Sequence, residues 1–232
     1  MGSVLAELTN RHGIALDNHF RSVIERRRYL FHLHTTFSDG ASTVAEYCTY
    51  AQAHGYRMLV FTEHVRKKLD YDWYEYLDAI ARAGWFFPSL EIWTGCEAKV
   101  LLDGTLDMPD NLPGLDLVCM AEHGDYRYRG GWETALRLAF NLDSDSPRVW
   151  VHPFRWLAAQ GYQVGDESSM IFLLEMARLS GVIVETMSER EKRLLKLNER
   201  IIGWRVKADL LKMLDSGDAI VGQDAHSVED LD

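Results

Sequence analysis

Histidines and carboxylates recur in this sequence where short apolar runs end. The first such run ends in His32-Leu33-His34, and Asp39 follows five residues after the second histidine. In a β-strand, residues i and i+2 project from the same face, so His32 and His34 would point together while Leu33 turns into the packing. Neutral imidazole is a common ligand of zinc, manganese and iron ions. The stretch therefore predicts half of a metal site.

Five later runs end in the same kind of side chain. The full set of candidate metal ligands is His32, His34, Asp39, His64, Glu97, His123, His152, Asp224 and His226. The set holds six of the chain's nine histidines, which random placement would scatter. One catalytic ion takes three protein ligands and keeps an open position. Three divalent ions that share bridging ligands would use the whole set, and a two-ion site is the alternative.

The intervening sequence alternates β-rich runs with amphipathic helical segments. Strands are expected at residues 30–34, 57–62, 91–97, 116–121, 149–152, 182–186 and 219–222, and helices at 44–54, 73–87, 132–141, 169–179 and 197–214. Such alternation predicts βα units and a parallel sheet, hence an α/β fold. The candidate ligands all fall at carboxyl ends of strands, where (β/α) barrels build their active sites. We therefore expect a distorted (β/α)7 TIM-like barrel, with an open doubly wound sheet as the alternative.

Composition and charge indicate which partners and which cellular location to expect. The 232 residues carry a formal charge of −10, which argues against nucleic acid and anionic membrane surfaces as partners. No apolar run reaches the ~20 residues of a membrane span, and the N-terminus lacks the pattern of a secretion signal. Three cysteines without CxxC spacing favour a reducing, cytoplasmic location. We expect an N-terminal helical extension over residues 1–29 and a metal-binding barrel domain over residues 30–232.

Taken together, the motifs resemble the polymerase-and-histidinol-phosphatase (PHP) superfamily. They are His-x-His-Thr-x-x-Ser-Asp-Gly at 32–40, Thr-Glu-His at 62–64, Gly-x-Glu at 95–97, His123, Val-His-Pro-x-Arg at 151–155 and Asp-Ala-His at 224–226. The resemblance implies a distorted seven-stranded barrel with a trinuclear zinc, manganese or iron site that hydrolyses phosphoesters. Histidinol-phosphatase-like hydrolysis of a small phosphomonoester is the leading expectation.

Catalysis at such a site needs no side-chain nucleophile. The expected nucleophile is a metal-bridging hydroxide, because bound divalent ions lower the pKa of water and polarise phosphoryl oxygens. Arg155 is the first candidate for gripping the phosphate, since its planar fork suits phosphate oxygens, and Arg66 and Arg127 are weaker candidates. Glu63 or Glu185 could orient a ligating imidazole.

Several other functions stay open at this point. A phosphodiesterase or 3′–5′ exonuclease, and a protein-tyrosine phosphatase, belong to the same superfamily. An amidohydrolase also uses HxH on the first barrel strand, but Asp39, His64 and the Asp224/His226 pair count against it. A regulatory phosphoprotein-binding domain is the non-enzymatic reading, and the complete ligand set argues against it. The expected partner is a small-molecule phosphoester substrate, and a homo-oligomer is compatible with the sequence.

Overall fold

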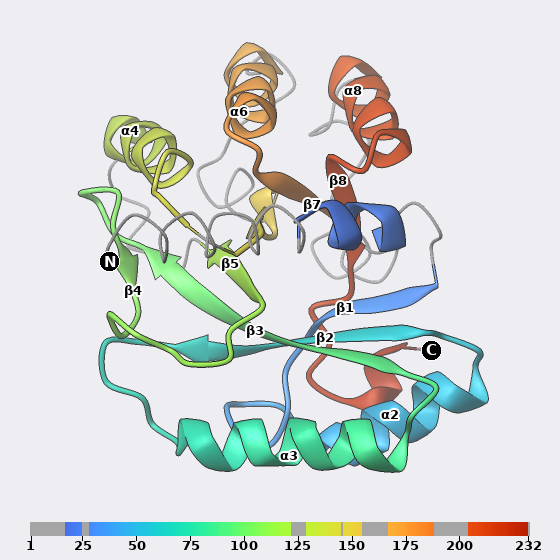
Figure 1. The fold of residues 1–232 in the computed structure, drawn as a ribbon. Helices are drawn as coiled ribbons and strands as arrows, with labels where there is room; N and C mark the ends of the chain where they lie inside the picture. Colours follow the sequence, from blue (N-terminus) through green and yellow to red (C-terminus); the bar gives the residue numbers. More distant parts are fainter. Residues whose placement is uncertain are drawn as a thin grey trace, which may run out of the picture.

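A curved and mainly parallel sheet organises the protein (Figure 1). The computed structural model describes residues 17–24, 28–121, 129–144, 146–154, 167–187 and 204–231. Neighbouring parallel strands follow the chain order β1 (Tyr29–Leu33), β2 (Met58–Val65), β3 (Glu91–Val100), β5 (Leu117–Ala121), β6 (Arg148–Trp150), β7 (Ile183–Met187) and β8 (Ala219–Gly222). All seven expected strands are present, with ends that differ by at most three residues.

The two ends of this sheet meet, so the barrel is nearly closed. Beyond β8, the backbone N–H groups of Gln223 and Ala225 donate to the carbonyls of Phe31 and His32 at 3.0 and 3.1 Å. The His34 N–H donates back to the Ala225 carbonyl at 2.9 Å. These bonds form a parallel bridge between Leu33 and Ala225. The TIM-like barrel is thus confirmed, and the open sheet is excluded.

One short strand was not expected. β4 (Leu106–Asp107) pairs antiparallel with Lys99 and Val100 at the end of β3. The turn between them contains Gly104, which has a φ of 83°. This positive φ is readily adopted by glycine, so the chain can fold back sharply and lengthen the wall above the carboxyl end of β3.

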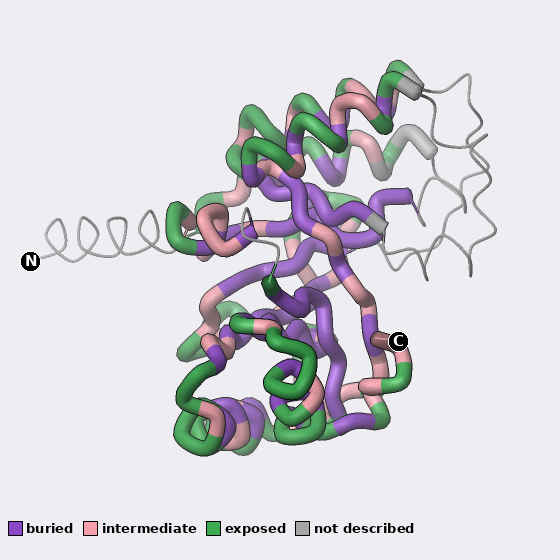
Figure 2. The backbone as a smooth tube through the Cα atoms, turned by 90° about the vertical axis from the view of Figure 1, so that its right-hand side faces the viewer, coloured by how far each residue is buried: buried purple, intermediate pink, exposed green. Residues whose placement is uncertain are grey.

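Helices cover the sheet from outside (Figure 1). α2 (Val44–Ala53) and α3 (Trp73–Phe86) pack near β1, β2 and β3, whereas α4 (Arg129–Ala139), α6 (Glu167–Leu179) and α8 (Trp204–Asp215) lie over the strands from β5 to β8. A short 3-10 helix, η2 (Val228–Leu231), follows β8. Figure 2 shows buried backbone running through the strands and exposed positions on the outer helices.

Local sequence explains where these helices begin and which face they bury. Thr43 and Glu46 form a capping box at the start of α2, and Asp72 caps the first turn of α3. In α3 the buried positions are Trp73, Tyr76, Ile80 and Ala83, at the three- and four-residue spacing of an amphipathic helix.

The barrel interior forms a separate core, closed at the amino ends of the strands by the helix of residues 17–24. Alternate strand residues such as Phe31, Val60 and Trp93 point inward, and Phe20 packs on Trp93 with ring centroids 5.1 Å apart. Arg21 donates to the carbonyls of Gly181 and Gly217, which precede β7 and β8. Within the described residues the expected N-terminal helix therefore seals the barrel end opposite the candidate ligands. No helix there is long and apolar enough to cross a membrane.

Candidate metal centre

Four donor atoms converge at the carboxyl end of β1. The Nε2 atom of His32 lies 3.7 Å from Glu97 Oε2 and 3.6 Å from Asp224 Oδ1. The Nε2 atom of His34 lies 3.5 Å from each of the same two oxygens. Ligand atoms about 2.1 Å from one tetrahedrally coordinated ion are about 3.4 Å apart. We call His32, His34, Glu97 and Asp224 the inner cluster. The atoms of His32, His34 and Glu97 lie close enough together to hold one metal ion, and Asp224 lies at similar distances from both imidazoles.

The chemistry of the inner cluster supports the same fit. Nε2 of His32 and both ring nitrogens of His34 are buried without a hydrogen-bond partner in the described part of the chain. A buried polar atom without a partner costs free energy, and buried imidazoles normally find one. A bound cation would satisfy the nitrogen atoms that face Glu97 and Asp224.

Glu97 faces two groups of ligands at once. Its Oε1 lies 2.7 Å from His152 Nε2, and its Oε2 lies 2.8 Å from His64 Nδ1 and within reach of the inner histidines. The side chain is 1% exposed, so these imidazoles surround a carboxylate that is shielded from water. A carboxylate in this position can bridge two ions.

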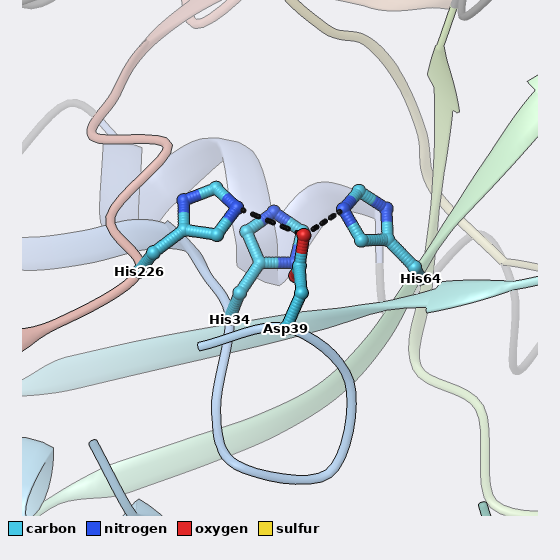
Figure 3. Close-up of side chains that lie close together, drawn as sticks. All are labelled: His34, Asp39, His64 and His226. Atoms are coloured by element: carbon cyan, nitrogen blue, oxygen red, sulfur yellow. Dashed lines mark ion pairs between the residues drawn. The ribbon is translucent and has the colours of Figure 1, made fainter. Parts of the chain in front are cut away.

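A second group of ligands lies closer to solvent (Figure 3). The carboxylate of Asp39 sits between two imidazoles, with Oδ2 3.4 Å from His64 Nε2 and 3.5 Å from His226 Nε2. The His34 ring lies behind Asp39, stacked at centroid distances of 4.4 Å from His64 and 4.5 Å from His226. We call His34, Asp39, His64 and His226 the outer cluster, which could hold another metal ion.

The backbone is strained at three of the candidate ligands. Among the described residues, the non-glycine residues with positive φ are His32 at 67°, His152 at 35° and Asp224 at 47°. Such conformations cost about 1–3 kcal/mol each and persist only where the surrounding structure enforces them. At His32 the β1–β2 pairing also shifts register. The orientation of these three side chains therefore costs the fold some of its stability.

Glu185 holds two of the strained residues in place. Its Oε1 accepts a hydrogen bond from His32 Nδ1 at 2.7 Å, and its Oε2 accepts one from the His152 backbone N–H at 2.5 Å. The first bond turns His32 Nε2 toward the inner cluster and fixes the tautomer that a metal needs. A side chain at Gly222 would overlap the Glu185 carboxylate, a constraint that the sequence analysis missed because no local pattern signals it.

Glu63 has a different role from the one considered in the sequence analysis. Its buried carboxylate contacts no ligating imidazole by hydrogen bond among the described residues; instead it accepts from the Thr35 N–H at 3.0 Å and the Ser38 hydroxyl at 2.5 Å. The turn that carries Asp39 is thereby tied to β2. Burial raises the pKa of Glu63, and the bonds from Ser38 and Thr35 partly offset this effect.

Burial and neighbouring charges shift the pKa values of His32, His34 and Glu97 in different directions. Burial lowers the pKa of His34 to about 4, so its imidazole is neutral at neutral pH. Burial acts in the same direction on His32, but the carboxylates of Glu185 and Asp224 outweigh it and raise the pKa of His32 well above its usual value. Burial favours the protonated form of Glu97, but its hydrogen bond with His152 and the nearby imidazoles of His32 and His64 hold its pKa well below the usual range. Glu97 is therefore an anion ready to bind cations.

Eight of the nine predicted metal ligands lie in the part of the chain that the structure describes. It brings together His32, His34, Asp39, His64, Glu97, His152, Asp224 and His226. His123, Arg127 and Arg155 lie outside the described residues. Arg66 lines a cavity of about 700 Å³ that opens over the outer cluster and also contains Glu97 and Asp224 in its wall.

A TIM-like barrel whose carboxyl-end mouth holds these histidine and carboxylate clusters has the architecture of a metal-dependent hydrolase. Residues 31–129 match the family model of the PHP domain, the same family that the motifs resemble. A similar protein is the DNA polymerase/3′-5′ exonuclease PolX of Bacillus subtilis (strain 168). It is 26% identical over 218 residues, which cover 87% of this chain and 34% of PolX. The chain thus spans about a third of that relative's length.

Proposed function

We propose that this protein is a metal-dependent phosphatase that hydrolyses a small-molecule phosphomonoester. The observation that carries the proposal is the gathering of the inner and outer clusters beside one cavity at the barrel mouth. The cavity volume of about 700 Å³ is typical of a small-molecule site. The proposal includes three divalent ions of zinc, manganese or iron, because Glu97 faces two groups of ligands and Asp39 organises a further one.

The residues would divide the work of holding these ions. The inner cluster would hold one, and Glu97 with His152 and the predicted ligand His123 would hold a second. Asp39, His64 and His226 would hold a third. When bound, such ions polarise phosphoryl oxygens, lower the pKa of water and stabilise the leaving oxygen.

Charge supports an anionic substrate despite the acidity of the whole chain. Three divalent ions carry more positive charge than the carboxylates of Asp39, Glu97 and Asp224 can neutralise. At short range the field of bound ions dominates over a net charge of −10. Arg66 in the cavity wall adds a further cation for binding the substrate, and Arg155 and Arg127 remain proposed to bind the phosphate that is cleaved.

A 3′–5′ exonuclease or other phosphodiesterase is the second candidate. The similarity to PolX favours it, since that relative is named a 3′-5′ exonuclease. The acidic charge of this chain argues the other way, because binding to nucleic acid is driven by cationic surfaces.

The test is a substrate panel assayed after reconstitution with manganese, zinc or iron. The panel contains sugar phosphates, histidinol phosphate, nucleoside monophosphates, phosphodiesters and a single-stranded oligonucleotide. We expect phosphomonoester hydrolysis that His34→Ala abolishes. His54→Ala is the matched control, because His54 is an exposed histidine that stacks on Tyr50 at the end of α2, away from both clusters.

Two outcomes would contradict the proposal. Hydrolysis of the oligonucleotide without hydrolysis of any monoester would favour the exonuclease. Hydrolysis of amides without hydrolysis of phosphates would remove the phosphoesterase assignment altogether.

A further inference from the structure

Strands β2 and β3 continue outward beyond their candidate metal ligands. In the parallel register His64 pairs with Glu97, and both side chains point into the mouth of the barrel. Arg66 follows His64 by two residues, and Lys99 follows Glu97 by two residues. Since side chains two apart in a strand share a face, these cations form a second layer, about 7 Å beyond the ligands. Both line the same cavity as the ligands.

The cations of this second layer, and Lys68 beside them in the cavity wall, are not neutralised by neighbouring acids. The side chains of Arg66, Lys68 and Lys99 form no hydrogen bond or ion pair with any residue that the structure describes. Arg66 and Lys68 are exposed, and Lys99 is half-buried in β3. Two cations without an acidic partner, at the ends of neighbouring strands, are suited to bind an anion in the cavity that both of them line.

Two carboxylates share this wall, and one of them has a structural role. Asp107 in β4 accepts a hydrogen bond from the Lys67 backbone N–H at 3.1 Å, which ties the segment after β2 to the β3–β4 hairpin. The other, Asp70, lies at the outer edge and is exposed. Beyond the candidate ligands, three cations therefore share this part of the cavity wall with two carboxylates. The hairpin keeps the segment that carries Arg66 beside the strand end that carries Lys99.

We propose that Arg66 and Lys99 bind a second anionic group of the substrate, while the clusters bind the phosphate that is cleaved. The substrate class is a small molecule with two anionic groups, one phosphate and a second phosphate or carboxylate, about 7 Å apart. The cavity of about 700 Å³ accommodates such a molecule, and the aromatic rings of Phe37 and Tyr71 line it beside the cations. This inference rests on the proposed phosphatase function and adds a specificity determinant to it.

The first test measures binding without turnover. Metal-loaded protein is titrated calorimetrically with butane-1,4-diyl bisphosphonate and with butylphosphonate, which differ only in the second anionic group. We expect the bisphosphonate to bind at least about tenfold more tightly, since a hydrogen bond to a charged group contributes about that factor or more. Arg66→Met and Lys99→Met should each reduce the ratio of the two affinities at least about fivefold.

Lys67→Met is the matched control for these variants. It removes the same charge from the same segment, but the Lys67 side chain does not line the cavity. The control should keep the affinity ratio of the natural chain. A ratio near one in the unaltered protein, or an equal loss of affinity for both ligands in the Arg66 and Lys99 variants, would overturn the inference.

A second test compares hydrolysis of fructose 1,6-bisphosphate with that of fructose 6-phosphate. A higher kcat/KM for the bisphosphate, lost in Arg66→Met and Lys99→Met, supports the inference. Equal kcat/KM values together with equal phosphonate affinities overturn it and leave the phosphatase function intact. No hydrolysis of any phosphoester, with the phosphonate preference preserved, counts against the phosphatase function and leaves the second anion site standing. Cation dependence confined to a single-stranded oligonucleotide overturns the small-molecule assignment.

Discussion

The carboxylate of Glu185 lies directly over the Cα of Gly222, in the space that a side chain at residue 222 would fill. Glu185 comes from β7 and Gly222 ends β8, just before the candidate ligand Asp224. Because Glu185 also binds His32 and the backbone of His152, the absence of a side chain at one position supports the geometry of three others.

Gly222→Ala should therefore damage the site without removing any ligand. The new methyl group forces Glu185 aside, and crowding of this kind in a packed interior costs about 1–3 kcal/mol. We expect urea denaturation of the metal-free protein to show that loss, and metal titration to show weaker binding. Gly84→Ala in α3 is the control, because a Cβ there meets nothing within 4 Å and should stabilise the helix by about 0.5–1 kcal/mol.

Glu185→Gln should weaken metal binding even though its shape is conserved. Both carboxylate oxygens of Glu185 accept hydrogen bonds, one from His32 Nδ1 and one from the His152 N–H. A glutamine can accept only one of them, and its amide N–H₂ would face the other donor. Loss of a hydrogen bond that orients a ligating histidine costs about 10- to 100-fold in metal affinity. Competition with a fluorescent chelator measures this loss.

The control for that variant is Glu175→Gln. It removes one carboxylate from the exposed face of α6, so it changes net charge equally and should leave metal affinity unaltered. If both variants bound metal as the natural chain does, the orienting role of Glu185 would be wrong.

The barrel was predictable because its signals are repeated along the chain. Each buried strand reads as a short apolar run, and each helix as an amphipathic segment, so the order of elements follows from local sequence. Closure followed from chemistry: Asp224 and His226 could join His32 and His34 only if the last strand lay beside the first. The backbone bonds between residues 223–225 and 31–34 confirm that reasoning.

The local geometry of the site was less predictable, because contacts across the chain override the strand pattern. The sequence analysis treated His32 as a regular strand residue, but it has a φ of 67° and interrupts the β1–β2 register. Glu185, 153 residues away, stabilises the rotated imidazole. Glu63 was considered as an orienter of histidine, whereas it binds the turn of Ser38. Strand β4 was not predicted, because it has only two residues and lies in no apolar run.

Ser38→Ala should loosen the outer cluster selectively. The Ser38 hydroxyl donates to Glu63, and this bond fixes the turn that presents Asp39 to His64 and His226. Its removal takes a hydrogen bond from a buried carboxylate, which costs about 1–3 kcal/mol of stability. We expect metal analysis after gel filtration to show fewer ions per chain, with the inner cluster still loaded. Thr36→Ala, an exposed position in the same turn, is the control, and an equal loss in both variants would contradict the selective role.

Metal binding should release protons and strengthen as pH rises. The pKa of His32 lies well above 6.5 in the metal-free fold, because Glu185 and Asp224 outweigh the effect of burial. A raised pKa stabilises the metal-free fold below about pH 6.5, and this contribution is lost as the pH rises through the folded value. Metal needs the neutral imidazole, so an ion entering the inner cluster must displace that proton. His34, with a pKa of about 4, releases none near neutrality.

Calorimetric titration with manganese or zinc between pH 6.5 and 8, in two buffers of different protonation enthalpy, measures this release. His32 should release a proton to the buffer when an ion fills the inner cluster, and the affinity for that ion should rise with pH. His19→Ala is the control, since His19 contacts Glu91 at the opposite end of the barrel and its loss should leave the proton release on metal binding unchanged. Metal binding with no buffer dependence would mean that His32 is already neutral, and the charge balance derived for the inner cluster would then be wrong.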